Sequence, residues 1–275
     1  MTSGTDLRTV IDLERYPVVD FATVAARAVI DRQRRSLAEK GVAILPEFVT
    51  AAAIACMARE ALAWQAKAHL EDVWGTPYLS VPDEAYPADH PRRALEHSLT
   101  WVIAYDVIPR AAGVLTLYEW DPLMHFVGEI LERRPLYRMA DPLGALNVTI
   151  MTDGHQQGWH YDNTEFVVSL ALQSSAGGGQ FESAPFIRSA DDEHYDAVAR
   201  MLRGAAGERV EVFPMTPGTL MIFAGRHSLH RVTAVAGDVP RLVALLAYDT
   251  RPDSDSSEVF KFLRYGRATP LPAEQ

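Results

Sequence analysis

The sequence predicts an α+β protein whose core is a double-stranded β-helix, a jelly roll of the cupin type, with N-terminal helices packed on it. Helical patterns dominate residues 1–140, which would form a helical buttress and carry a loop able to act as a lid. Over residues 141–267, short apolar and β-branched runs recur between Gly, Pro and Asp turns, as in antiparallel sandwiches and barrels. We therefore expect a single domain over residues 1–275, with a loose tail at 268–275.

The helical half begins with a helix that has clear signals at both ends. Asp20 or Thr23 can cap its start, and it runs to Lys40 before Gly41 ends it. A β-branched strand, a long helix rich in Ala, Leu and Met, a Pro- and Gly-rich loop and two shorter helices follow: residues 42–45, 50–74, 74–93, 115–120 and 122–133. A loop of that length in a compact domain is often a lid or a binding loop.

The second half contains seven expected strands separated by turn signals such as Asp-Gly, Gly-Gly-Gly and Pro-Gly. These strands are residues 145–151, 166–173, 180–182, 209–213, 219–223, 230–235 and 241–248. In a jelly roll the ends of different strands converge at one mouth, so polar residues at those ends can form a single site.

Composition and charge narrow the class of protein. The chain has 48% hydrophobic and 23% charged residues, which are ordinary globular values. Its net charge of −10 argues against a nucleic-acid-binding surface. No apolar run has the length of a membrane span, and the N-terminus lacks the apolar region of a signal peptide. The one cysteine, Cys56, lies in an apolar helical stretch and is expected to be a small buried hydrophobe. We expect a cytoplasmic protein, either monomer or homodimer.

Three His-x-acid pairs occur in the chain: His69 with Glu71, His194 with Asp196, and His160 with Asp162. The first two lie in patterns interpreted as helices, where residues two apart point to nearly opposite sides and cannot easily share a metal. The third pair opens an apolar run interpreted as a buried strand. In an extended chain, residues i and i+2 face the same way, so only this pair has the geometry to chelate a metal.

His160 and Asp162 are followed by two further residues with complementary chemistry, His230 and Arg241. Two imidazoles and one carboxylate can hold Fe(II) on one face and leave the other face open. A short turn at 238–240 would let a hairpin place Arg241 beside the strand of His230, where it can pair with the far carboxylate of 2-oxoglutarate. The pattern predicts an enzyme that uses Fe(II), 2-oxoglutarate and O₂, releases succinate and CO₂, and oxidises an unactivated C–H bond.

Two other histidines compete with these ligands. His227 lies in the turn before His230. We favour His230 as the metal ligand because it starts a strand-like run. His155 lies in the turn before His160, where a surface histidine is the simpler interpretation. Alternatives of another class are a Zn-binding jelly roll and a non-catalytic jelly roll with a silent site.

Several segments around these residues resemble the iron and 2-oxoglutarate oxygenases related to the radical halogenases of free amino acids such as lysine. The resembling segments are residues 117–120, 137–147, 158–166, 178–181, 217–220, 225–233 and 240–250, and the likeness covers roughly 95–267. The resemblance implies a jelly-roll fold and a small amino-acid-like substrate. The halogenases have Gly where this chain has Asp162, and halide fills that iron site. A carboxylate there predicts hydroxylation, with desaturation, cyclisation or halogenation as alternatives.

Five further residues are candidate contacts for the co-substrate or the substrate. Asn147 and Thr149 share one face of the strand before the metal motif and can touch 2-oxoglutarate or substrate. Gln157 and Asn163 flank the motif and can meet a zwitterion, although a turn or cap hydrogen bond is the simpler role. His97, from the segment after the long loop, can close over a substrate carboxylate together with Arg92 and Arg93, unless it is simply solvated.

The residues that share a face of the last strand with Arg241 can indicate the type of substrate if that face lines the pocket. Residues 243, 245, 247 and 249 follow Arg241 on that face, and it is mostly apolar. If this face lines the pocket, the substrate side chain near it is apolar or small; if it fills the barrel, it says nothing about the substrate.

Overall fold

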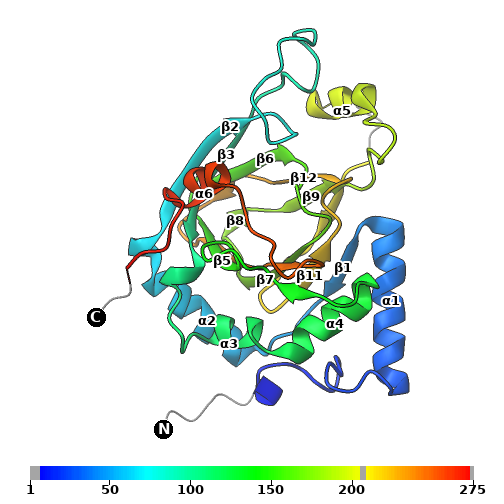
Figure 1. Ribbon diagram of the computed structural model, residues 1–275, viewed down its shortest axis with the longest axis vertical. Coiled ribbons are helices and arrows are strands. Elements are labelled where there is room, and N and C mark those ends of the chain that lie inside the picture. Colours follow the sequence, from blue (N-terminus) through cyan, green and yellow to red (C-terminus); the bar gives the residue numbers. More distant parts are fainter. Residues whose placement is uncertain (1–6, 205–208, 273–275) are drawn as a thin grey trace.

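The computed structural model describes residues 7–204 and 209–272, and its centre is a curled antiparallel sheet (Figure 1). One layer pairs in the order β1 (Val42–Leu45), β11 (Leu220–Phe223), β7 (Val167–Gln173), β14 (Arg241–Leu246) and β5 (Leu146–Met151). The opposite layer pairs in the order β6 (Gln156–His160), β12 (Leu229–Val232), β9 (Phe181–Ala184) and β10 (Glu211–Phe213). This arrangement confirms the predicted jelly roll.

One long strand joins the two layers. β3 (Glu96–Ile103) pairs with β5 through its last three residues and with β6 through Ser98 and Leu99. Along its other edge, β3 pairs with β2 (His69–Gly75) over seven residues. Two short pairs complete the strands: β4 (Tyr137–Arg138) with β15 (Tyr248–Asp249), and β8 (Gly177–Gly178) with β13 (Val235–Ala236). β3 therefore gives the barrel one continuous wall, to which β2 adds an outer strand.

Four helices cover the outside of the first layer (Figure 1): α1 (Val24–Lys40), α2 (Ala51–Ala63), α3 (Gly113–Tyr118) and α4 (Asp121–Leu131). Their apolar faces and the sheet share one hydrophobic cluster that includes Ile54, Phe126, Val168 and Leu170. The Thr23 hydroxyl accepts a hydrogen bond from the Ala26 N–H at the start of α1, as a cap should. Two more helices, α5 (Tyr195–Leu202) and α6 (Glu258–Tyr265), lie at the other end of the barrel. None of the helices in the described part of the chain combines the length and hydrophobicity needed to span a bilayer.

The predicted long helix over 50–74 is wrong in its second half. α2 ends at Ala63, a short 3₁₀ turn follows at Gln65–Lys67, and β2 begins at His69. β2 is a strand because its whole length pairs with β3. That pairing partner lies beyond a long loop, so local composition does not reveal it. The first 140 residues thus contribute strands as well as helices.

Other local predictions also need correction. Cys56 is exposed, because the buried face of α2 is formed by Ile54, Met57, Ala58 and Ala61. The expected helix around His194 begins only at Tyr195. The expected strand 230–235 divides into β12 and β13, and β6 and α6 were not predicted at all.

The predicted neighbourhood of the last strand is wrong as well. β14, which begins at Arg241, lies between β7 and β5, whereas β12 lies between β6 and β9 in the opposite layer. No hairpin joins these two strands. Arg241 and His230 instead line the same cavity from strands of the two opposite layers.

Candidate active site

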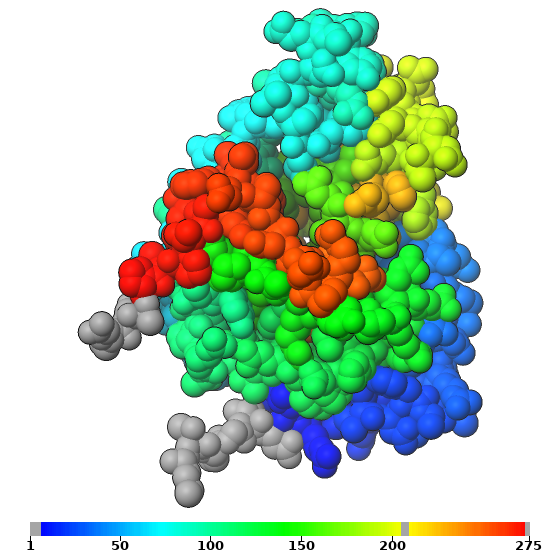
Figure 2. All heavy atoms as spheres, viewed as in Figure 1, coloured from blue at the N-terminus to red at the C-terminus, as the bar shows by residue number. Residues whose placement is uncertain are grey.

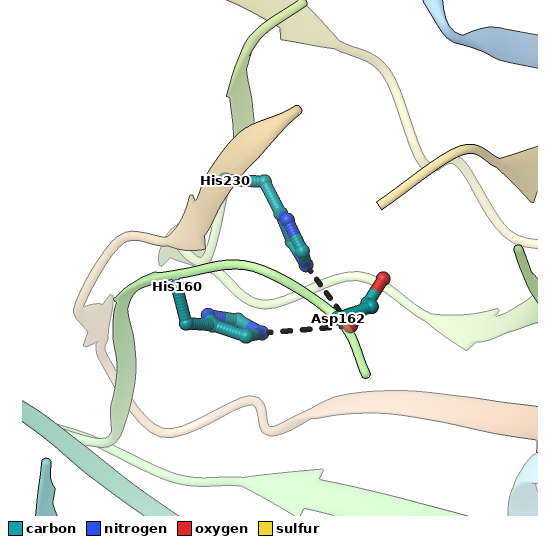
Figure 3. A group of neighbouring side chains, drawn as sticks. All are labelled: His160, Asp162 and His230. Atoms are coloured by element: carbon teal, nitrogen blue, oxygen red, sulfur yellow. Dashed lines mark ion pairs between the residues drawn. The ribbon is translucent and has the colours of Figure 1, made fainter. Parts of the chain in front are cut away.

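Three ligand-type side chains meet at the mouth of the barrel (Figure 3). His160 ends β6 and lies directly opposite His230 on β12, while Asp162 follows two residues after His160. The Nε2 atoms of His160 and His230 lie 3.9 and 3.5 Å from Asp162 Oδ1. The Phe223 ring packs edge-on against His230, with ring centroids 4.6 Å apart, and so holds that imidazole in place.

Backbone carbonyls orient both imidazoles. The Nδ1 of His160 lies 2.8 Å from the Gly158 carbonyl oxygen, and that of His230 lies 3.0 Å from the Ser228 carbonyl oxygen. A carbonyl only accepts, so each Nδ1 carries the proton and each Nε2 keeps its lone pair for a ligand. Burial, together with the nearby His230, lowers the pKa of His160 to about 4, so this imidazole is neutral at pH 7. Neutral, oriented nitrogens are the form that binds a metal.

The carboxylate of Asp162 occupies a space that only glycine could leave for it. A Cβ added to Gly225 would lie 1.6 Å from Asp162 Oδ2, and the Asp162 N–H donates to the Gly225 carbonyl at 3.1 Å. Asp162 Oδ2 is buried and has no hydrogen-bond partner among the residues that the structure describes. Burial alone would raise the pKa of Asp162, but the adjacent imidazoles of His230 and His160, which attract the carboxylate when they carry a second proton, outweigh burial and lower it. The site therefore presents an ionised oxygen and two nitrogens, a donor set that fits Fe(II).

The three residues line a cavity of about 310 Å³, which lies at the small end of ligand pockets. Figure 2 shows the surface hollowed beside the red-orange C-terminal segment that includes α6. Of the predicted residues, Arg241, Asn147, Thr149, Gln157 and Asn163 all line this cavity. The structure thus brings together the metal triad and five of the six other predicted site residues.

Arg241 is buried without a counter-ion. Its Nη1 lies 3.8 Å from Met151 Sδ, and it makes no ion pair with any carboxylate in the described residues. Burial lowers the pKa of Arg241 to about 10, which still leaves it charged at pH 7. An unpaired guanidinium is costly to bury, so this end of the cavity suits an anion.

The weaker candidates are distributed unequally. Thr149 Oγ1 donates to the Val243 carbonyl at 3.3 Å, which ties β5 to β14 at the cavity wall. His97 lies elsewhere: its ring stacks on Trp74 at 4.4 Å, and its Nε2 lies 2.8 Å from Asp72 Oδ1. Since β3 turns His97 away from the cavity, the structure does not bring it to the other site residues.

The structure also shows where the two alternative ligand histidines, His227 and His155, lie. His227 lies half-buried in the turn after β11, and the group that can hold a metal in the described chain contains His230 instead. His155 is buried, not exposed as expected, and the turn at its position packs against β13. His69 and Glu71 lie on a strand, so the prediction that they lie on a helix and point to nearly opposite sides is wrong. They are still absent from that metal-binding group.

Sequence reasoning did not assign two charged cavity residues, Glu71 and Arg264, to the site. Arg264 comes from α6, which Ser257 caps and Gly266 ends in the left-handed conformation. These cap signals can be seen in the sequence. The buried face of α6 carries Lys261, Arg264 and Tyr265, so its amphipathic pattern points the opposite way from the usual one.

The fold is similar to that of three solved proteins. An oxidoreductase of the 2OG-Fe(II) oxygenase family from Burkholderia pseudomallei is 17% identical over 82% of this chain and 92% of that chain, with a TM-score of 0.52. The α-ketoglutarate-dependent epimerase SnoN from nogalamycin biosynthesis is 16% identical over 90% and 91%, with a TM-score of 0.59. A prolyl-4-hydroxylase from Pseudomonas putida is 14% identical over 79% and 97%, with a TM-score of 0.50.

No curated protein sequence matches the chain. Residues 88–261, more than half of the chain, match the family described as Halogenase D. This segment contains the metal triad and Arg241, whereas the cavity residues Glu71 and Arg264 lie outside it. The chain belongs to the halogenase D family and is an enzyme with the fold of the Fe(II)- and 2-oxoglutarate-dependent oxygenases.

Proposed function

We propose that this enzyme hydroxylates an unactivated C–H bond of a small free amino acid or amino-acid-like molecule, with release of succinate and CO₂. The observation that carries the proposal is a buried Arg241, with no carboxylate partner in the described part of the chain, in the same cavity as an oriented His-Asp-His set. When bound, Fe(II), 2-oxoglutarate and O₂ supply the oxidising power that removes hydrogen from an unactivated carbon.

The residues of the chain have separate tasks in this proposal. His160, Asp162 and His230 would hold the iron through two nitrogens and one oxygen. Arg241 would bind the far carboxylate of 2-oxoglutarate in a two-pronged hydrogen bond. Asn147 and Thr149 line the cavity on the strand next to Arg241 and would flank the co-substrate.

Asp162 favours hydroxylation over halogenation. The halogenases that the chain resembles carry Gly at this position, where halide binds. Here the carboxylate fills the position and Gly225 leaves space for it. If the purified enzyme, given Fe(II), 2-oxoglutarate, substrate and chloride, yields a chlorinated product, this assignment of Asp162 fails.

The cavity walls support a small substrate with an apolar side chain. Val243, Leu245 and Ala247 line the cavity beyond Arg241, which supports an apolar surrounding for the substrate side chain. Gln157 and Asn163 line it beside the metal motif and would donate or accept hydrogen bonds from a zwitterion. The helices and strands share one hydrophobic core, which supports a single domain. We also propose a cytoplasmic location.

Succinate release over a panel of free amino acids and small derivatives, with mass spectrometry of the products, tests the function. Asp162→Ala and His230→Ala should each abolish substrate-dependent succinate release, because each removes an iron ligand. Anaerobic addition of Fe(II) and 2-oxoglutarate should produce a metal-to-ligand charge-transfer band. A wild-type protein that shows no such band, or an Arg241→Ala variant that binds 2-oxoglutarate normally, would contradict the proposal.

A further inference from the structure

We propose that the buried ion pair of Glu71 and Arg264 is the subsite for the charged head group of an amino-acid substrate, with Arg264 binding its carboxylate and Glu71 its ammonium. This inference rests on the proposed function, since it concerns the same cavity. Arg264 Nη1 donates to Glu71 Oε2 at 2.7 Å, and both residues are less than one-tenth exposed. Both line the cavity and neither belongs to the metal triad, although Arg264 bonds to Asn147, one of the two residues proposed to flank the co-substrate.

The two buried arginines of the cavity lie at opposite ends of one strand face. Met151, at the end of β5, contacts Arg241. Asn147, four residues earlier on the same face, accepts a hydrogen bond from Arg264 Nη2 at 3.3 Å. Four residues of strand span about 13 Å at roughly 3.3 Å per residue. Arg241 and Arg264 can therefore serve two different anions, the co-substrate and the substrate.

The Glu71–Arg264 pair has hydrogen-bonding capacity to spare. A guanidinium has five N–H donors, of which Glu71 and Asn147 take one each, and the Tyr265 side chain is a third hydrogen-bond partner of Arg264. A carboxylate offers about four lone-pair sites, of which the bond to Arg264 uses one. A buried pair of opposite charges is costly to hold unless further partners satisfy it. A zwitterion would offer one further charged partner to each residue and would add no net charge to the pair.

The other lining residues define the rest of the substrate. Val73 and Leu79 line the cavity near Glu71 in the chain, and Phe260 lines it one turn before Arg264. The remaining acidic residue of the cavity wall, Asp249, accepts a hydrogen bond from the Arg251 N–H. A zwitterionic head group with an uncharged aliphatic side chain fits this combination of one charged corner and apolar walls.

A purely structural role is the alternative, because the pair also connects α6 to β2. Lys261 provides the matched control for that role. It lies on the same helix one turn earlier, is buried, and bonds to Asp255 at 2.6 Å and lies 3.7 Å from Asp141. It does not line the cavity. Lys261→Met therefore loosens α6 without removing a proposed substrate contact.

The test is a binding titration of the anaerobic Fe(II)–2-oxoglutarate complex, read from the change in its charge-transfer band. The probes are L-norvaline, L-leucine, L-isoleucine and L-methionine. The tightest is then compared with its amine, which lacks the carboxylate, and with its acid, which lacks the ammonium. For leucine these are 3-methylbutylamine and 4-methylpentanoate. Wild type should prefer the amino acid over the amine by about 100-fold, as expected for a buried charge pair.

Arg264→Gln should reduce the preference over the amine to within about 3-fold, and Glu71→Gln should do the same for the acid. A structural role would weaken all probes alike and leave these ratios unchanged, which would overturn the proposal. The double variant Glu71→Gln/Arg264→Gln leaves no unpaired charge, so it keeps the test valid if a single variant does not fold. Lys261→Met should keep the wild-type ratios, and loss of them there would also overturn it.

The inference and the function fail in different ways. If the charge-transfer band forms but none of the four amino acids changes it in wild type, the zwitterion subsite is refuted and the oxygenase stands. If the band never forms in any variant, the proposed function itself fails.

Discussion

Replacing Arg241 with Met should make the empty protein more stable and its co-substrate binding weaker. Arg241 is buried in the cavity and has no anionic partner in the described chain. Burial lowers the pKa of Arg241 well below the ordinary arginine value, to about 10, which means that its charge costs about 3 kcal/mol, at 1.36 kcal/mol per pKa unit. Methionine fills similar volume without that cost.

The sign of this effect follows from proton linkage. The unfolded chain holds the arginine proton more tightly than the folded chain does, so the penalty applies in full at pH 7 and fades only above about pH 10. Removing it should raise the melting temperature of the empty protein by up to about 6 °C, at about 2 °C per kcal/mol for a chain of this size. 2-Oxoglutarate affinity should fall by roughly 30- to 4,000-fold, because a buried charge pair lost on one side costs about 2–5 kcal/mol.

Calorimetry of the metal-free protein and an anaerobic 2-oxoglutarate titration measure the two effects separately. Arg264→Met is the contrasting variant: it breaks a buried pair with Glu71 and should lower the melting temperature, since an orphaned buried charge costs about 3–5 kcal/mol. The reasoning about Arg241 is refuted if Arg241→Met destabilises the empty protein while 2-oxoglutarate affinity changes by less than about 3-fold.

Three further perturbations test the site and its surroundings. The pKa of His160, near 4, lies below that of a histidine in the unfolded chain, so acid favours unfolding. Urea unfolding of the metal-free protein should therefore show a loss of about 2 kcal/mol of stability between pH 7 and 4.5. The His160→Gln variant should lose less stability over the same range. Gly225→Ala should weaken Fe(II) binding at least about tenfold through its clash with Asp162, and adding Asp162→Gly should restore its thermal stability but not its metal binding. Tyr195→Phe removes the hydroxyl that accepts from Arg92 Nε at 2.8 Å, so hydrogen exchange in the loop after β2 should become faster; unchanged exchange would show that this link does not hold the loop.

The motif residues could be predicted because the chemistry depends on local spacing. His160 and Asp162 lie two apart in extended chain, and β6 and β12 bring His230 opposite His160. The predicted route from His230 to Arg241 was wrong, yet both side chains reach one cavity. A jelly roll makes its two layers face each other, so strands that never pair can still share a site.

Glu71 and Arg264 show why the rest could not be predicted. Glu71 lies in a segment whose composition suits a helix, and only its pairing with β3 makes it a strand residue that faces the cavity. Arg264 lies on a helix that buries its charged face, which reverses the usual reading of amphipathic periodicity. Their contact joins residues 193 positions apart in the sequence, and no local pattern predicts a contact between such distant residues.

The sequence by itself determined the fold class, the oxygenase chemistry and the candidate iron ligands, because alternation of apolar residues, turn residues and a short ligand spacing are all local properties. Tertiary structure alone decided that Arg241 is buried with no anionic partner among the described residues, that Gly225 leaves space for Asp162, and that Glu71 contacts Arg264 at the cavity wall. Burial and long-range pairing depend on how distant segments pack, and these features are the ones that bear on what the enzyme binds.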